Sequence, residues 1–192
     1  DQIVLLDGHG QEFLTQLQTA DGGRLRGTIL SRQVATGEPN VQLTLYQCAL
    51  KADKFEWVLQ KGTELGVSNF VPVISRRTVV RPVAILAKKY RRWRAIIREA
   101  AEQCGRGRLP QLALAVDLEM AVANAGGARL LPWEEAQGRP GLQTALTAQM
   151  PTVGCDNRAV SLLIGPEGGL APDEVDSAEA AGWQVVSLGR RI

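Results

Sequence analysis

A glycine-rich loop with one carboxylate is the stretch of this sequence best suited to hold a small ligand. The loop runs from Gly165 to Gly169, contains Glu167, and follows an apolar run, 159–164, that favours a strand. Glycine allows positive φ and lets a ligand approach the main chain closely. In an open parallel sheet, ligands bind at loops of this kind, after the carboxyl ends of strands. An ordinary tight connection between a strand and a helix is the alternative interpretation.

Two further stretches could surround the same ligand. They are Leu131-Pro132-Trp133 and residues 188–192, Leu-Gly-Arg-Arg-Ile, each after a predicted strand. Backbone groups at three strand ends would suit an uncharged adenine ring and its sugar. The sequence has no G-x-x-x-x-G-K-[ST] motif, no G-x-G-x-x-G after a strand and no G-x-S-x-G elbow. An α/β enzyme that uses an adenine nucleotide is a weaker interpretation of such a pocket.

Positive charge is concentrated in one segment. Between Arg76 and Arg108 there are 11 Lys and Arg residues and 2 acidic residues, whereas the remainder has 11 basic and 18 acidic residues. This imbalance favours a polyanion partner over a merely solvated helix face. The arginines of this segment that could contact such a polyanion are Arg76, Arg77, Arg94, Arg98, Arg106 and Arg108.

Composition excludes several classes of protein. No apolar run approaches the roughly 20 residues of a membrane span, and no signal peptide opens the chain. Cys48, Cys104 and Cys155 are far apart with no C-x-x-C pair, which fits a reducing cytoplasm and argues against a structural zinc site. The single histidine, His9, lies in a predicted turn, so a Ser-His-Asp or two-histidine metal mechanism is poorly supported.

Two kinds of structure must position these residues. Residues 1–48 read as four short strands separated by turns, at 3–6, 12–17, 25–30 and 41–46, which indicates a small barrel or sandwich. Strands then alternate with helices, which predicts an α/β unit with a mostly parallel sheet and helices on both faces. A long basic helix is expected over residues 83–104. The other expected strands are 70–74, 112–116, 128–131, 159–164 and 183–188, and the other helices 53–65, 117–125, 141–148 and 172–181.

Four motifs, in the same order along the chain, resemble those of one protein family. They are Lys61–Val67 (KGTELGV), Glu99–Arg106 (EAAEQCGR), Leu163–Gly169 (LIGPEGG) and Leu188–Ile192 (LGRRI). The family is that of the bacterial 16S ribosomal RNA uridine-N3 methyltransferases, in the SPOUT (trefoil-knot) superfamily. The resemblance covers nearly the whole chain.

This resemblance implies an RNA-binding, PUA-like β-barrel within residues 1–48 and a SPOUT methyltransferase domain with a C-terminal knot in residues 49–192. It also implies a homodimer that uses S-adenosylmethionine to methylate N3 of a uridine near the decoding region of 16S ribosomal RNA or the small ribosomal subunit. It implies that neither a metal nor a membrane takes part. The implied cofactor-binding residues are Leu131, Pro132, Ile164, Gly165, Pro166, Glu167, Gly168, Gly169, Leu188, Gly189, Arg191 and Ile192.

The two ends differ from the family pattern. The chain opens at Asp1 directly on a predicted strand, whereas family members begin with further barrel residues. It stops at Ile192, whereas family members continue through the knot. We therefore expect a partial barrel and an incomplete last cofactor loop.

Two residues are candidates for catalysis. Uridine N3 must lose a proton, and Arg106 could stabilise the resulting anionic ring. Glu167 could act as a general base or hold its loop by accepting backbone N–H bonds, and the second role is favoured. The alternative function is a non-catalytic RNA-binding module that uses the basic helix 83–104.

Overall fold

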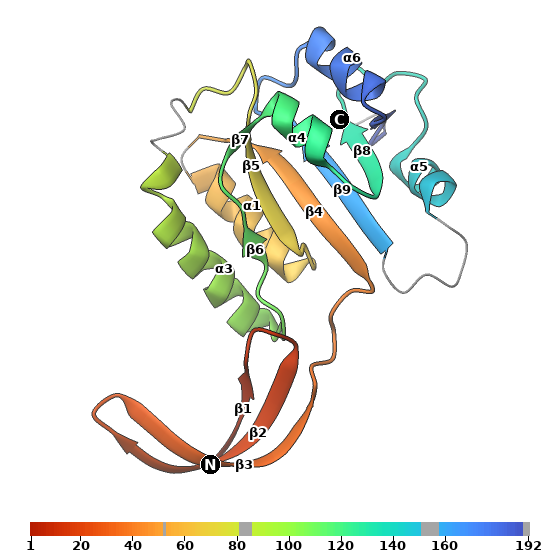
Figure 1. Cartoon of the computed structure of the whole chain (residues 1–192). Coiled ribbons are helices and arrows are strands. Elements are labelled where there is room, and N and C mark those ends of the chain that lie inside the picture. The colour runs from red at the N-terminus through yellow and green to blue at the C-terminus, as the bar shows by residue number, and fades with distance from the viewer. Residues whose placement is uncertain (52, 81–85, 151–157, 190–192) are drawn as a thin grey trace.

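A seven-stranded parallel sheet forms the centre of the molecule (Figure 1). The computed structural model describes residues 1–51, 53–80, 86–150 and 158–189. The strand order is β10-β8-β9-β4-β5-β6, and β7 also pairs with β5. All six pairings in this sheet are parallel, as predicted. The strands are β4 (Val41–Cys48), β5 (Asn69–Ile74), β6 (Gln111–Leu112), β7 (Val116–Asp117), β8 (Ala128–Pro132), β9 (Arg158–Ile164) and β10 (Gln184–Val186).

Helices cover both faces of this sheet, which confirms the predicted architecture. Successive residues of β4 point to opposite faces. Leu45 packs in one core with Phe55 of α1 (Asp53–Glu64) and Trp93 of α3 (Tyr90–Cys104). Tyr46 packs in the other core, with residues of α4 (Leu118–Asn124) and α6 (Pro172–Ala180). A further helix, α5 (Leu142–Gln149), buries Ala145 on the same face as α1 and α3.

A separate three-stranded antiparallel sheet precedes the parallel sheet (Figure 1). It consists of β1 (Gln2–Leu6), β2 (Gln11–Asp21) and β3 (Arg24–Val34), and every residue of β3 is exposed. The fourth strand predicted for this unit was misplaced, because β4 lies between β9 and β5 in the parallel sheet. The first half of β4 alternates between apolar and polar residues like a barrel strand, but its last four residues are all buried.

The small sheet is attached to the loop that follows α3. Gly10 N–H donates to the carbonyl oxygen of Gly107 at 2.8 Å, and Leu109 N–H donates to the carbonyl oxygen of Gly8 at 3.1 Å. A Cβ at Gly107 would lie 2.1 Å from the Cβ of Ala35, so only glycine fits this close approach.

Two predicted elements have different bounds. The basic helix was predicted over residues 83–104, but α3 begins at Tyr90. It follows a turn in which Lys89 N–H donates to the carbonyl oxygen of Leu86 at 2.8 Å. Residues 81–85 lie outside the described residues. The strand predicted at 112–116 is two short strands, β6 and β7, which pair with opposite ends of β5. Within the described ranges, no helix is long and apolar enough to cross a membrane.

Candidate functional site

Three loops meet where β8, β9 and β10 end, and they enclose a cavity of about 170 Å³. Because the strands are adjacent and parallel, their carboxyl ends lie at one edge of the sheet. We call this cavity the three-loop pocket. Its lining residues are Pro132, Trp133, Glu134, Ile164, Gly165, Pro166, Gly169 and Leu188.

The structure brings six of the twelve predicted pocket residues together: Pro132, Ile164, Gly165, Pro166, Gly169 and Leu188. Leu131 instead points into the core and is fully buried, while Glu167 and Gly168 make contacts outside the pocket. Gly189 follows Leu188 on the exposed surface. Arg191 and Ile192 lie outside the described residues.

Main-chain hydrogen bonds fix the glycine loop. The buried Gln47 side chain donates from Nε2 to the carbonyl oxygen of Gly165 at 3.3 Å. Gly169 N–H donates to Pro166 at 2.9 Å. A Cβ at Gly165 would lie 3.2 Å from the nitrogen of Leu170, so the loop folds tightly on itself where a ligand could approach its backbone.

The loop after β5 is bonded to the glycine loop and to the start of α6. Arg77 Nη1 donates to the carbonyl oxygens of Gly168 at 2.9 Å and Leu170 at 3.4 Å. Glu174 accepts from Arg76 N–H at 2.8 Å through one oxygen and from Ala171 N–H at 2.9 Å through the other. These contacts give Arg77 and Glu174 roles in shaping the pocket wall that the sequence did not reveal.

Arg76 lies beside the first turn of α6. Its guanidinium forms a two-pronged ion pair with the carboxylate of Asp173. This hydrogen-bonded guanidinium lowers the pKa of Asp173. Of the arginines predicted to bind phosphate, Arg76 and Arg77 are therefore engaged with protein groups next to the three-loop pocket.

The carboxylate of Glu167 faces the start of α1. Oε1 accepts from Lys51 N–H at 3.2 Å and lies 3.3 Å from Lys54 Nζ. The pKa of Glu167 is lowered by a hydrogen bond from its own backbone N–H, and also by Lys51 and Lys54, against a smaller opposing effect of burial. A lowered pKa weakens a base, so the geometry favours the loop-holding role over general-base catalysis.

Arg106 lies at the opposite end of the parallel sheet from the three-loop pocket. Its guanidinium is buried. Nη1 donates to the carbonyl oxygens of Thr63 at 3.2 Å and Val67 at 2.6 Å. Nη2 forms an ion pair with Glu38 Oε2 at 2.9 Å. Val67 lies two residues before the start of β5, whereas the pocket lies beyond the carboxyl ends of the strands. This arrangement favours a structural role for Arg106 over the predicted catalytic one.

The remaining predicted RNA contacts lie on two surfaces. Arg94 and Arg98 are exposed on α3, and they have no ion pair with another residue in the described part of the chain. A spacing of four residues puts both on one face of the helix. Arg108 is exposed at the junction with the small sheet, where its backbone N–H donates to Glu38 at 3.0 Å.

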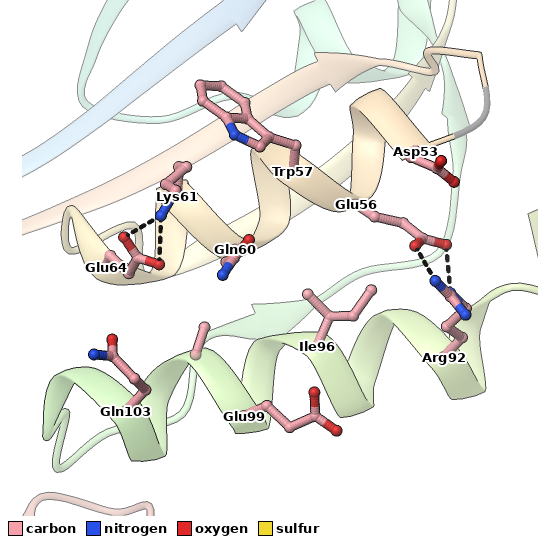
Figure 2. A pocket seen from close by; sticks show the side chains of 11 residues that line it. Asp53, Glu56, Trp57, Gln60, Lys61, Glu64, Arg92, Ile96, Glu99 and Gln103 are labelled. Atoms are coloured by element: carbon pink, nitrogen blue, oxygen red, sulfur yellow. Dashed lines mark hydrogen bonds and ion pairs between the residues drawn. The ribbon is translucent and has the colours of Figure 1, made fainter.

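A larger hollow of about 820 Å³ lies between α1 and α3 (Figure 2). Arg92 forms two hydrogen bonds to Glu56, of 2.8 and 2.7 Å, and Lys61 pairs with Glu64 at 2.9 Å. Asp53 and Glu99 add two further carboxylates to its lining. This excess of negative charge makes the groove unsuitable for RNA phosphates. Within the described residues, no group of three or more His, Cys, Asp or Glu could hold a metal ion.

The comparison with family models identifies the main part of the chain. Residues 37–192 match the model of an RNA methyltransferase domain. The chain belongs to this family. The family prediction from the four sequence motifs is therefore confirmed.

Curated relatives of this chain have a more specific name than that of the domain family. The Ribosomal RNA small subunit methyltransferase E of Bacillus subtilis is 31% identical over 199 residues, which cover 100% of this chain and 75% of the relative. The protein of that name from Mycobacterium bovis is 34% identical over 200 residues, which cover 100% of this chain and 72% of the relative.

Solved structures agree with these matches. A Ribosomal RNA small subunit methyltransferase E from Neisseria gonorrhoeae, bound to S-adenosyl methionine, has a TM-score of 0.86 at 29% identity and covers 100% of this chain and 76% of its own. A methyltransferase structure from Legionella pneumophila, in complex with the same cofactor, has a TM-score of 0.85 at 29% identity with the same coverage.

Proposed function

We propose that this protein uses S-adenosylmethionine to methylate N3 of a uridine in 16S ribosomal RNA, near the decoding region. The observation that carries the proposal is the three-loop pocket, in a chain that resembles small-subunit RNA methyltransferases over its full length. Two structural neighbours bind S-adenosylmethionine. The proposed substrate is ribosomal RNA, and the proposed location is therefore the cytoplasm.

The three-loop pocket has a chemistry that fits the adenosine part of this cofactor. Trp133, Ile164, Pro166 and Leu188 provide apolar walls for a ring, and the glycine loop exposes main chain at its edge. Its volume of about 170 Å³ is below the roughly 300–1,000 Å³ of typical ligand pockets. It would therefore enclose only one part of the cofactor.

The residues of this chain would act mainly by positioning. When bound, S-adenosylmethionine would supply a methyl group from its sulfonium sulfur; the sulfur would leave as a neutral thioether, and the N3 proton would pass to solvent. Gln47 and Arg77 would hold the glycine loop in one shape, so that the methyl group faces the incoming nitrogen. Alignment of this kind lowers a barrier without covalent or metal chemistry from the protein.

RNA binding would use surfaces outside the pocket. We propose phosphate contacts for Arg94 and Arg98 of α3, because both are exposed and form no ion pair within the described residues. We also propose that the small antiparallel sheet is part of a PUA-like, RNA-binding barrel, with the boundary moved from residue 48 to the segment between β3 and β4. The homodimer and the C-terminal knot are further proposals that rest on the family resemblance.

The test is methylation of ribosomal RNA from cells that lack the gene. Protein and S-adenosylmethionine are incubated with 16S RNA or with small subunits, and the nucleosides are analysed by mass spectrometry. We expect 3-methyluridine at one position. Unmodified uridine with both substrates, despite tight RNA binding, would support the non-catalytic RNA-binding alternative instead. Light scattering in the same buffer tests the homodimer.

A further inference from the structure

Among the described residues that line the three-loop pocket, Glu134 has the only ionisable side chain. The other lining residues are apolar side chains and glycines, namely Pro132, Trp133, Ile164, Gly165, Pro166, Gly169 and Leu188. The carboxylate of Glu134 is exposed, and it has no hydrogen bond or ion pair with another described residue. One negative charge therefore faces an otherwise uncharged cavity.

Gly169 makes room for this carboxylate. A Cβ at Gly169 would lie 1.8 Å from Oε1 of Glu134 and 3.2 Å from Oε2, so any other residue would displace the carboxylate. Gly169 also has a φ of 68°, in the left-handed region that favours glycine. The glycine loop after β9 and the loop after β8 thus meet at the Glu134 carboxylate.

We propose that Glu134 makes this pocket prefer the methyl donor over the demethylated product. This inference rests on the proposed function. S-adenosylmethionine has a positive sulfonium, whereas S-adenosylhomocysteine has a neutral thioether at the same place, so the two ligands differ by one methyl group and one positive charge. A carboxylate at the pocket wall attracts the first ligand more strongly and leaves the neutral ring and sugar contacts of both unchanged.

The physical reason also sets the size of the effect. The carboxylate is exposed, so water and salt screen its attraction to the sulfonium. We expect the ratio of dissociation constants, product over donor, to fall about three- to tenfold when the charge is removed. This preference would help the product to leave after each methyl transfer.

Calorimetry with the purified protein tests this inference. Dissociation constants for S-adenosylmethionine and S-adenosylhomocysteine are measured for the original protein, for Glu134→Gln, and for the control Glu135→Gln, whose neighbouring exposed carboxylate does not line the pocket. We expect Glu134→Gln to weaken donor binding and leave product binding nearly unchanged, and Glu135→Gln to change neither. We also expect the ratio for the original protein to shrink at higher salt.

Two results would overturn the inference. Equal weakening of both ligands by Glu134→Gln would mean that the side chain accepts a hydrogen bond from a group that the ligands share, such as a ribose hydroxyl. No change in either dissociation constant would mean that Glu134 does not face the ligand. Failure of the proposed function is distinct, because it would appear as unmodified uridine in the methylation assay and not as a change in the ratio of the two dissociation constants.

Discussion

The guanidinium of Arg77 donates a 2.9 Å hydrogen bond to the carbonyl oxygen of Gly168, although the two residues are 91 positions apart in the chain. Arg77 follows β5 and Gly168 follows β9, with β4 between these two strands in the sheet. The contact therefore crosses the carboxyl end of β4 and holds one wall of the three-loop pocket.

Removal of this contact should weaken cofactor binding. A hydrogen bond to a charged group stabilises by roughly 1.5–3 kcal/mol, and in an exposed position we expect the lower end of that range. Arg77→Ala should raise the dissociation constant for S-adenosylmethionine about tenfold, as measured by calorimetry. Arg77→Lys should recover part of the loss, because it restores a donor without the planar guanidinium.

The same variants separate a positioning role from the predicted phosphate contact. A positioning residue should change the KM for the cofactor and leave the KM for RNA nearly unchanged. If Arg77→Ala instead lowered RNA affinity and left cofactor affinity unchanged, Arg77 would be a phosphate contact and its bond to Gly168 incidental.

The exposed arginines of α3 should show the opposite behaviour. Each phosphate contact that is lost reduces the slope of log affinity against log salt by about 0.7–0.9. Arg94→Ala and Arg98→Ala should each weaken RNA binding and lower that slope in filter-binding titrations, with cofactor affinity unchanged. The control is Arg139→Ala, since Arg139 is exposed away from α3 and pairs with Glu179 at 2.9 Å. An equal loss of RNA affinity in all three variants would indicate only a general effect of net charge.

The glycine loop could be predicted well from the sequence because the residues that define it are consecutive in the chain. Strand, glycines and helix start follow one another, and the structure has β9, the loop and α6 in that order. Partners remote in the sequence could not be predicted in the same way. The basic segment was recognised by its charge, but charge does not reveal that Arg106 is paired with Glu38, 68 residues away, or that Arg77 bonds to Gly168.

The position of β4 was missed for a related reason. Alternation of apolar and polar residues over 41–46 predicts a strand without saying which sheet it joins. Only the parallel pairings to β5 and β9 place it at the centre of the larger sheet. Glu134 was likewise hidden in a predicted loop, because its exposure to the pocket depends on Gly169 in another loop.

Two glycines with similar backbone angles should respond differently to alanine. Gly127 has a φ of 69° and Gly138 a φ of 76°, so both pay the cost of a left-handed alanine, about 1 kcal/mol. A Cβ at Gly127 would lie 2.1 Å from the backbone oxygen of Ala159, whereas a Cβ at Gly138 meets open space. Gly127→Ala should therefore lower the free energy of unfolding by about 2–3 kcal/mol more than Gly138→Ala in urea titrations. Equal losses of unfolding free energy in the two variants would show that the chain near Ala159 moves to accept the methyl group.

The ion pair between Glu38 and Arg106 should make stability depend on pH. Burial opposes ionisation of Glu38, but hydrogen bonds from Arg106 and from Arg108 N–H, together with the positive charge of Arg106, outweigh it and hold the pKa of Glu38 below its ordinary value of 4.5. A carboxyl whose pKa is lower in the folded state stabilises the fold above its unfolded pKa, and this stabilisation is lost as pH falls through the folded pKa.

We therefore expect Glu38→Gln to lower the free energy of unfolding by about 1–2 kcal/mol at pH 7, with a difference from the original protein that shrinks below about pH 4.5. Urea titrations at pH 7, 5 and 3.5 measure this difference. Glu119→Gln on the exposed side of α4 is the matched control, and it should show little difference at any of these values. A Glu38→Gln loss that stayed constant from pH 7 to 3.5 would contradict this, and would mean that the loss comes from the second accepting oxygen, which an amide lacks, and not from the charge.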